Sequence, residues 1–301
     1  MKNLRINIDE YRDAQKYITR AEHDFSYKLD AAIDKVFENG CPKIITLAGP
    51  TCSGKTTTAN KLVERIKAEG KNAVTLSIDD FFIDRTDRNV VDGEAPDYDS
   101  VKAIDLPLLE VFVRDLLAGK TVNVPHFDFE TTHRTGYTEF KPHKNDIYLF
   151  EGIQAVYPEV TRLFGRDYRS IFIAVVDPVK YKGAVLDKNE IRLFRRIVRD
   201  AYFRNATAEF SLHLWQTVRA NEEENIFPNA GNSDIYIDSF LRYEPFVMAR
   251  HAGELLKTVP EDSRYRAYAD ELLEKLKAFE CPFFKDEMIP RDSMFREFIG
   301  K

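Results

Sequence analysis

The sequence predicts an α/β fold in which helices cover both faces of a parallel sheet. Short apolar runs with the length of buried strands recur along the chain, at residues 43–48, 73–78, 147–150, 170–176 and 234–237. Helical patterns separate most of these runs, and buried strands that alternate with helices are typical of parallel sheets with two covered faces. Such sheets bind ligands at the carboxyl ends of their strands, so the residues that directly follow each run are the candidates for a site.

Apolar residues at helical spacing predict the helices around this sheet. Near the N-terminus the spacing is four, four and three, at Phe25, Leu29, Ile33 and Val36. Further helical patterns lie at residues 56–69, 106–117, 192–204 and 262–279. We therefore expect residues 1–40 to form an N-terminal helical extension with a packing role, and residues 41–301 to form the domain that carries the chemistry.

The composition narrows the class of protein. The 301 residues include 44 Lys and Arg against 50 Asp and Glu, a net charge of −6, which argues against a general nucleic-acid binder. No apolar run approaches the roughly 20 residues of a membrane span, and the first ten residues do not resemble a signal peptide. The three cysteines have no paired spacing, so a disulfide framework or a zinc site is not expected. A reducing, cytoplasmic location is the simplest interpretation.

Residues 49–56, with the sequence GPTCSGKT, match the phosphate-binding pattern G-x-x-x-x-G-K-[ST] between a predicted strand and a predicted helix. The glycines let the backbone curl so that its N–H groups point at phosphate oxygens, and the following helix adds its positive N-terminal end. Lys55 is expected to reach the β- and γ-phosphates, and the Thr56 hydroxyl to bind Mg²⁺. The residues predicted to contact the nucleotide here are Gly49, Thr51, Cys52, Ser53, Gly54, Lys55, Thr56 and Thr57. We expect the Cys52 side chain to point away from the phosphates.

Acidic residues directly follow two of the predicted strands. Asp79 directly follows the second run, and Glu151 directly follows the third. One carboxylate in such a place can take a proton from an attacking hydroxyl, and another can hold Mg²⁺. We predict Asp79 as the base and as a metal contact, and Glu151 as a metal contact, with Asp80 as a helper or a helix cap. Phe81 and Phe82 are expected in the core, although Phe82 is also a candidate for contact with the substrate.

Five arginines lie within thirteen residues, with only Asp200 as an acid among them; they are Arg192, Arg195, Arg196, Arg199 and Arg204. The positive charges on such a helix would repel one another unless anions bound to them. Guanidinium groups form good hydrogen bonds to phosphate oxygens. We predict a lid at about residues 188–230, in which Arg192 and Arg196 bind the nucleotide and Arg195 and Arg199 stabilise the transferred group. Arg192 is also expected near the acceptor. The alternative is a solvated charged face.

Several motifs in the same order resemble the phosphoribulokinase/uridine kinase family of P-loop kinases. They are the loop at 49–56, SIDDFF at 77–82, PHFDF at 125–129, FEGI at 150–153 and IRLFRRIVRD at 191–200. The last two are specific to this family. The resemblance covers about residues 40–300, and segments 215–228 and 293–300 resemble the larger bacterial uridine kinase-like proteins. The extra N-terminal domain of some of those relatives does not fit in forty residues.

The resemblance implies a three-layer P-loop kinase fold with a helical lid and C-terminal helices. It also implies ATP-dependent phosphorylation, with Mg²⁺, of the 5′-hydroxyl of a nucleoside. Uridine and cytidine are the first candidates for this nucleoside. Asp79 would be the general base, Lys55 and Thr56 would hold phosphate and Mg²⁺, and Glu151 would support the metal. Family members commonly form oligomers, so the resemblance is compatible with a homo-oligomer. Neither a nucleic acid nor a membrane is expected as a partner.

Two departures from the family pattern concern the acceptor. Phe127 stands where uridine kinases tend to have a tyrosine, and His133 is displaced by one residue from the histidine that helps to read the base. In the ribose-binding segment Lys102 stands where an acid is expected, and a lysine cannot accept hydrogen bonds from ribose hydroxyls. Asp97 and Asp99 are the candidates to replace that acid.

These departures leave two alternatives to a nucleoside kinase. The first is a kinase of the same family with another hydroxyl acceptor, such as a sugar phosphate or a pantothenate-like compound. An anionic acceptor would need spare cations, for which Lys102, Arg134 and Lys141 are candidates. The second is a regulatory protein that binds ATP without phosphorylating a small molecule.

Overall fold

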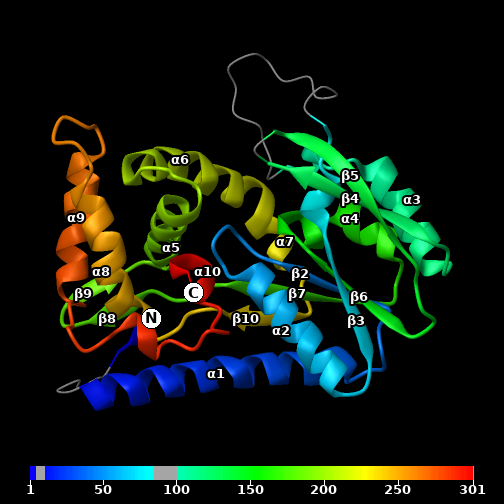
Figure 1. The fold of residues 1–301 in the computed structure, drawn as a ribbon, viewed down its shortest axis with the longest axis horizontal. Helices are drawn as coiled ribbons and strands as arrows, with labels where there is room; N and C mark the ends of the chain where they lie inside the picture. Colours follow the sequence, from blue (N-terminus) through cyan, green and yellow to red (C-terminus); the bar gives the residue numbers. More distant parts are fainter. Residues whose placement is uncertain (5–10, 85–99, 130, 301) are drawn as a thin grey trace.

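The computed structural model describes residues 1–4, 11–84, 100–129 and 131–300. Its centre is a five-stranded sheet in the order β10-β7-β2-β6-β3, in which all neighbours are parallel (Figure 1). The strands are β2 (Ile44–Ala48), β3 (Asn72–Ser77), β6 (Asp146–Glu151), β7 (Tyr168–Ala174) and β10 (Ile235–Asp238). This arrangement confirms the predicted α/β class.

The register of the sheet brings the predicted site residues to one edge. Every residue of β2 and of β6 is buried, which explains why apolar residues predominate in both strands. Ser77 at the end of β3 pairs with Glu151 at the end of β6, and Leu47 of β2 pairs with the same glutamate. The phosphate loop, which follows β2, therefore starts beside the acids that follow β3 and β6.

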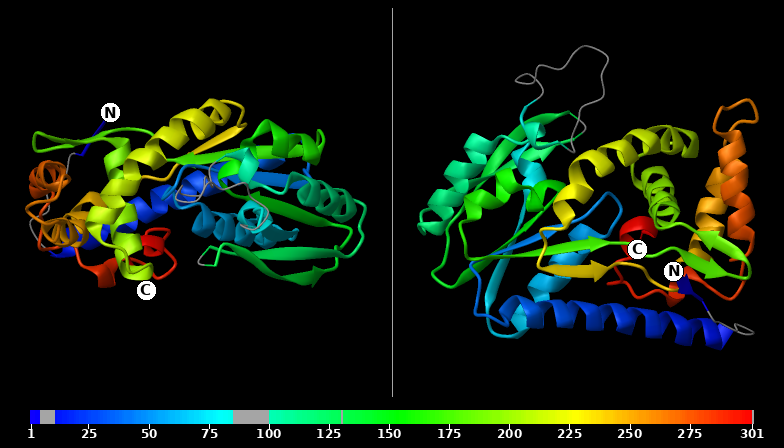
Figure 2. Two further views of the ribbon diagram at one scale, coloured as in Figure 1. Left: turned by 90° about the horizontal axis from the view of Figure 1, so that it is seen from above. Right: turned by 180° about the vertical axis from the view of Figure 1, so that it is seen from behind.

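Alternate residues of the strands divide the core into two parts. On one face Ile45, Leu47 and Leu149 pack with the helices α1 (Tyr11–Phe37), α2 (Lys55–Ala68), α5 (Lys188–Phe203), α8 (Glu244–Lys257) and α9 (Arg266–Lys277). On the other face Tyr148 and Phe150 pack with α3 (Leu106–Leu117) and α4 (Pro158–Thr161). The two faces account for the three layers, which the views in Figures 1 and 2 show from different sides.

The predicted N-terminal helix is present as α1, which runs along the length of the molecule (Figure 1). The four apolar residues that predicted it are at most 2% exposed, and they share one hydrophobic core with α2 and the central sheet. The helix is therefore part of the main core. No helix in the described part of the chain is both long and apolar enough to cross a membrane.

The sequence did not predict the two smaller sheets. One is an antiparallel hairpin of β4 (Val122–Asp128) and β5 (His133–Phe140). The other joins β1 (Lys2–Asn3), β8 (Val179–Tyr181) and β9 (Ala184–Leu186). Most residues of β5 are exposed or half-exposed, so the strand lacks the apolar run that marks a buried strand.

The predicted lid is helical. It contains α5, α6 (Ala208–Asn221), a π-helical turn η6 (Glu222–Ile226) and α7 (Phe227–Ala230). Helix α5 starts four residues before the predicted pattern, because Asp187 and Glu190 form a capping box there. The chain ends with α10 (Arg296–Ile299), and short 3-10 turns lie at η1 (Ile78–Phe81), η3 (Val101–Ala103), η4 (Ile153–Val156), η5 (Arg162–Phe164) and η7 (Asp286–Met288).

Candidate active site

The predicted phosphate loop connects β2 to α2 as a tight curl. Gly54 has a φ of 85°, a left-handed conformation that favours glycine, and a Cβ at Gly49 would lie 2.1 Å from the carbonyl oxygen of Ile173. The Lys55 ammonium donates to the carbonyl oxygens of Gly49 (2.9 Å) and Pro50 (3.2 Å), so it lies inside the curl. Among the described residues the buried Ser53 hydroxyl has no hydrogen-bond partner. A polar group of this kind fits a phosphate oxygen.

Two arginines of α5 hold the backbone of this loop. Arg192 donates to the carbonyl oxygen of Thr51 (3.1 Å) and to both carboxylate oxygens of Glu222 (2.5 and 2.7 Å). Arg195 donates to the carbonyl oxygen of Cys52 (3.0 Å) and to both oxygens of Glu244 (2.8 and 3.0 Å). Bidentate pairs of this kind fix geometry as well as charge.

These contacts correct one step of the sequence argument. Arg192 and Arg195 are at most 1% exposed, and each pairs with a glutamate from another element; Glu222 also pairs with Arg219, which has Glu223 as a second acid. The expectation that outside anions must neutralise the whole helix is therefore wrong for these two residues. Their roles at the nucleotide and the acceptor remain predictions.

The other three arginines of the helix all pair with Asp200, and Arg199 is also influenced by the charge of Glu297. Arg196, Arg199 and Arg204 approach Asp200 at 3.2, 2.9 and 3.4 Å, and the Asp200 side chain is 6% exposed. Three positive charges against one negative charge leave a surplus at this end of α5. This part of the helix therefore has the excess positive charge from which a phosphate-binding lid was predicted.

The two acids at the strand ends lie close enough to affect each other. Burial raises the pKa of Asp79 to about 6, an effect that Lys55 opposes and Asp80 increases. Burial also raises the pKa of Glu151 to about 7; the charge of Asp79 adds to this shift, whereas Lys55 and a hydrogen bond from Ser77 (3.3 Å) oppose it. Oδ1 of Asp79 has no hydrogen-bond partner among the described residues. A buried oxygen without a partner can accept a proton from a bound ligand.

Three phenylalanine rings form an edge-to-face cluster beside these acids. The ring centroids of Phe82, Phe127 and Phe129 are 5.3 to 5.6 Å apart. Phe82 and Phe127 are buried, whereas Phe129 is 49% exposed, and Phe81 lies fully in the core as expected. The backbone N–H of Phe127 donates to Asp80 (3.2 Å), so the β4–β5 hairpin is tied to the residue next to Asp79.

The basic candidates on the hairpin already have acidic partners. His133 Nδ1 lies 2.5 Å from Asp84 Oδ1, and the Arg134 guanidinium contacts Asp105 at 3.1 Å and the carbonyl oxygen of Phe82 at 3.2 Å. Lys102 and Lys141 are exposed. The predicted substrate residue Asp99, and Asp97 with it, lies outside the described residues.

The sequence argument missed three acids near the phosphate loop, namely Glu222, Glu244 and Glu297. Glu297 comes from the C-terminal tail, and its carboxylate accepts hydrogen bonds from the backbone N–H (3.3 Å) and the hydroxyl (2.8 Å) of Thr57. A signal for two of them was available, because Glu222 and Glu297 lie in the segments 215–228 and 293–300 that resemble the larger relatives. Nothing in the local spacing pointed to Glu244.

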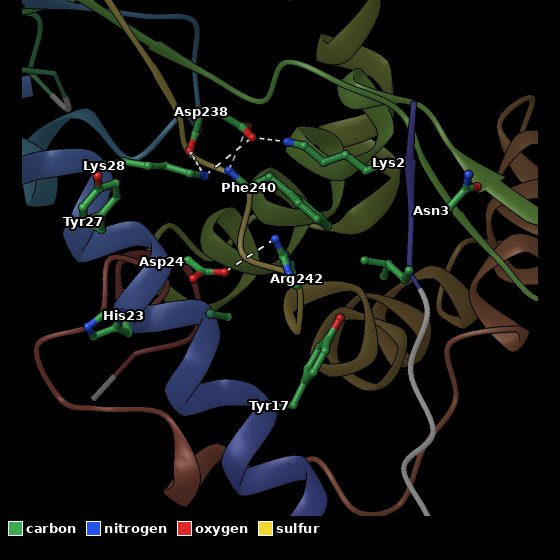
Figure 3. Close-up of a pocket in the computed structure, with 12 residues that line it drawn as sticks. Lys2, Asn3, Tyr17, His23, Asp24, Tyr27, Lys28, Asp238, Phe240 and Arg242 are labelled. Carbon is green, nitrogen blue, oxygen red and sulfur yellow. Dashed lines mark hydrogen bonds and ion pairs between the residues drawn. The ribbon is translucent and has the colours of Figure 1, made fainter. Parts of the chain in front are cut away.

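A cavity of about 700 Å³ lies away from this site, and the described residues that line it come from β1, α1 and the segment at the end of β10 (Figure 3). Lys2 and Lys28 both reach Asp238, and Arg242 lies 3.5 Å from Asp24. Each of these three cations therefore has an acidic partner, and Lys2 also lies 3.9 Å from Asp177 outside the cavity.

The family model described as "Phosphoribulokinase / Uridine kinase family" matches residues 44–243. Among similar proteins, a uridine kinase of Staphylococcus aureus is 29% identical over 64% of this chain and 86% of its own length. Uridine-cytidine kinase A of Dictyostelium discoideum is 28% identical over 65% of this chain, and the match spans only 36% of that protein.

A uridine kinase of Halobacterium salinarum is 27% identical over 64% of this chain and 78% of its own length. Among solved structures, a "Possible Uridine Kinase from Bacillus stearothermophilus" aligns with a TM-score of 0.49 and 16% identity, over 71% of this chain and 100% of that one. Glu244 and the tail that carries Glu297 lie beyond the matched family region.

Proposed function

The chain belongs to the phosphoribulokinase/uridine kinase family and is a kinase, and we propose that it transfers the γ-phosphoryl group of ATP to the 5′-hydroxyl of a nucleoside, with uridine and cytidine as the first candidates. The names of the similar proteins, which are uridine and uridine-cytidine kinases, support this acceptor class. The observation that carries the proposal is the Asp79 carboxylate, which follows β3 at the same end of the sheet as the phosphate loop, is influenced by the charge of Lys55 and has a buried Oδ1 atom without a hydrogen-bond partner among the described residues.

The phosphate loop would hold the triphosphate through its backbone N–H groups, the Ser53 hydroxyl and Lys55. Thr56 and Glu151, with Asp79 nearby, would hold Mg²⁺ together with phosphate oxygens and water, as Mg²⁺ prefers. When bound, the cation would neutralise charge on the phosphates. Arg196 and Arg199 carry the surplus positive charge of α5 and are the candidates to stabilise the transferred group.

Asp79 would take the proton of the acceptor hydroxyl as the phosphoryl group is transferred. Its pKa of about 6 leaves the carboxylate mostly ionised at neutral pH while making it a stronger base than an exposed aspartate. The Oδ1 atom, which has no partner among the described residues, provides the free oxygen that this step needs.

The aromatic cluster supports a flat acceptor. A base can stack against an exposed aromatic ring such as Phe129 for about 1–3 kcal/mol. His133 and Arg134, the basic substrate candidates on the hairpin, each pair with an aspartate, which favours a neutral acceptor over a phosphate ester. The missing hydroxyl at Phe127 predicts a relaxed choice between pyrimidines.

The test is acceptor-dependent release of ADP from ATP and Mg²⁺. The panel contains uridine, cytidine, adenosine, guanosine, a set of sugar phosphates and pantothenate. We expect the pyrimidine nucleosides to give the highest kcat/KM. Turnover with a sugar phosphate or pantothenate alone would refute the nucleoside assignment, and tight ATP binding without turnover on any acceptor would indicate a regulatory protein.

A further inference from the structure

The C-terminal tail packs directly against the phosphate loop (Figure 1). Met294, Phe295 and Phe298 are fully buried, and the sulfur of Met294 lies so close to Gly54 that a Cβ there would come within 2.3 Å of it. The centre of the Phe298 ring lies 5.0 Å from the Arg195 guanidinium. The same guanidinium donates to the Cys52 carbonyl oxygen of the loop. The tail and the loop therefore form one packed unit.

The backbone of the tail is fixed. The Arg296 guanidinium donates to four carbonyl oxygens of the same region, at 2.6 to 3.4 Å; they belong to Asp286, Ile289, Pro290 and Gly300. Glu297, between this arginine and the buried Phe298, is only half-buried. Its side chain can thus move while its backbone stays in place.

The Glu297 carboxylate binds the donors at the start of α2. Within the helix the first hydrogen bond runs from the Thr58 N–H to the Gly54 carbonyl oxygen (3.1 Å), so the N–H of Thr57 is one of the donors that a helix start leaves free. Glu297 takes this N–H and the Thr57 hydroxyl together. In a phosphate loop these are groups that an anionic ligand would use.

We propose that Glu297 competes with the phosphates of the bound nucleotide for Thr57, and thereby sets the affinity of the phosphate loop for its nucleotide. The inference rests on the proposed function only in that the loop binds ATP. Two anions cannot use the same N–H and hydroxyl, and a carboxylate beside a triphosphate also repels it. Binding therefore requires the Glu297 side chain to leave Thr57.

The test compares Glu297→Gln with a matched control, Asp292→Asn, in the full chain. Both variants remove one negative charge from the tail, but Asp292 is exposed and contacts Lys61 (2.9 Å) rather than the loop. The dissociation constants of MgATP and of inorganic tripolyphosphate are measured by calorimetry without an acceptor. Thermal unfolding checks that both variants are folded.

We expect Glu297→Gln to bind MgATP and tripolyphosphate roughly tenfold more tightly, the order of one charge-assisted hydrogen bond. Asp292→Asn should bind them like the unmodified protein, and the affinity for adenosine should not change in either variant. Unchanged or weaker binding by Glu297→Gln would overturn the inference, because the glutamate would then only support the loop.

This experiment separates the inference from the acceptor assignment. If no nucleoside stimulates turnover but Glu297→Gln tightens ATP binding, the competition holds and the nucleoside acceptor does not. If the unmodified protein and Glu297→Gln both fail to bind ATP and tripolyphosphate, the phosphate site itself is wrong and the inference falls with it.

Discussion

Two groups of charged residues near the phosphate loop differ in how their charges are compensated. In the bracing group, Arg192 and Arg195 are each matched by a glutamate and each donate to a loop carbonyl oxygen. In the reacting group, the charges are not matched: three arginines share Asp200, and Oδ1 of Asp79 has no partner among the described residues. The same helix, α5, contributes to both groups.

The difference teaches which charges hold the fold and which are left for a ligand. A buried charge with a full set of partners is costly to disturb but has little left to offer a substrate. A buried charge without a full set keeps an unfavourable energy in the folded protein, and a ligand of opposite charge can relieve it. Substitutions in the bracing group should therefore affect stability first, and substitutions in the reacting group should affect turnover first.

The largest effect is expected for Arg195→Leu. The substitution leaves Glu244 buried without its partner and removes the bond to the Cys52 carbonyl oxygen, so the free energy of unfolding should fall by about 3–5 kcal/mol. Urea unfolding followed by circular dichroism measures it.

Arg199→Leu is the matched control, because it is the same substitution one turn later on the same helix. Asp200 keeps Arg196 and Arg204 as partners there, so the loss of stability should be about 1 kcal/mol or less. Equal losses of stability in the two variants would break the distinction between the two groups.

The next effect is expected for Asp79→Asn. If Asp79 is the base, its amide cannot take the proton of the acceptor, and kcat should fall by about 10²–10⁴-fold. The dissociation constant of MgATP should change little, and the free energy of unfolding at pH 8 should rise by about 1 kcal/mol because a buried charge is gone. Steady-state kinetics, calorimetry and urea unfolding measure the three quantities; retained turnover would exclude Asp79 as the base.

The sequence predicted the parts of the molecule that local patterns encode. The five parallel strands, the phosphate loop and the acids Asp79 and Glu151 each follow from a run of apolar residues and the residue after it. Helix α5 follows from its spacing, although the pattern missed the first four residues, which the capping box of Asp187 and Glu190 begins. Burial on both faces makes β2 and β6 mostly apolar, which is why the sequence predicted these two strands.

The missed parts depend on contacts between distant residues. Arg192 meets Glu222 thirty residues later, Arg195 meets Glu244 forty-nine residues later, and Thr57 meets Glu297 across 240 residues. No spacing rule for a helix or a strand links such pairs. The β4–β5 hairpin was missed for another reason, since its half-exposed strands have no apolar run and include Pro125 and Gly136.

The smallest expected effect is a pH dependence of stability that belongs to the reacting group. Burial raises the pKa of Asp79 to about 6 and that of Glu151 to about 7, above their ordinary values of 3.8 and 4.5. Between about pH 4 and pH 7 the folded protein therefore holds protons that the unfolded chain has released, so the contribution of these acids to stability falls as the pH rises.

The comparison that isolates this contribution is between the unmodified protein and Asp79→Asn. Below about pH 4 both are neutral at this position, and their free energies of unfolding should agree. As the pH rises from about 4 to about 6, the unmodified protein should become less stable than the variant, because its unfolded chain has released the Asp79 proton that its folded state still holds; above about pH 6 the difference should level off. Urea unfolding at several pH values from below 4 to 8 measures the difference. A difference that stays constant with pH would place Asp79 among the fully compensated charges and remove it from the reacting group.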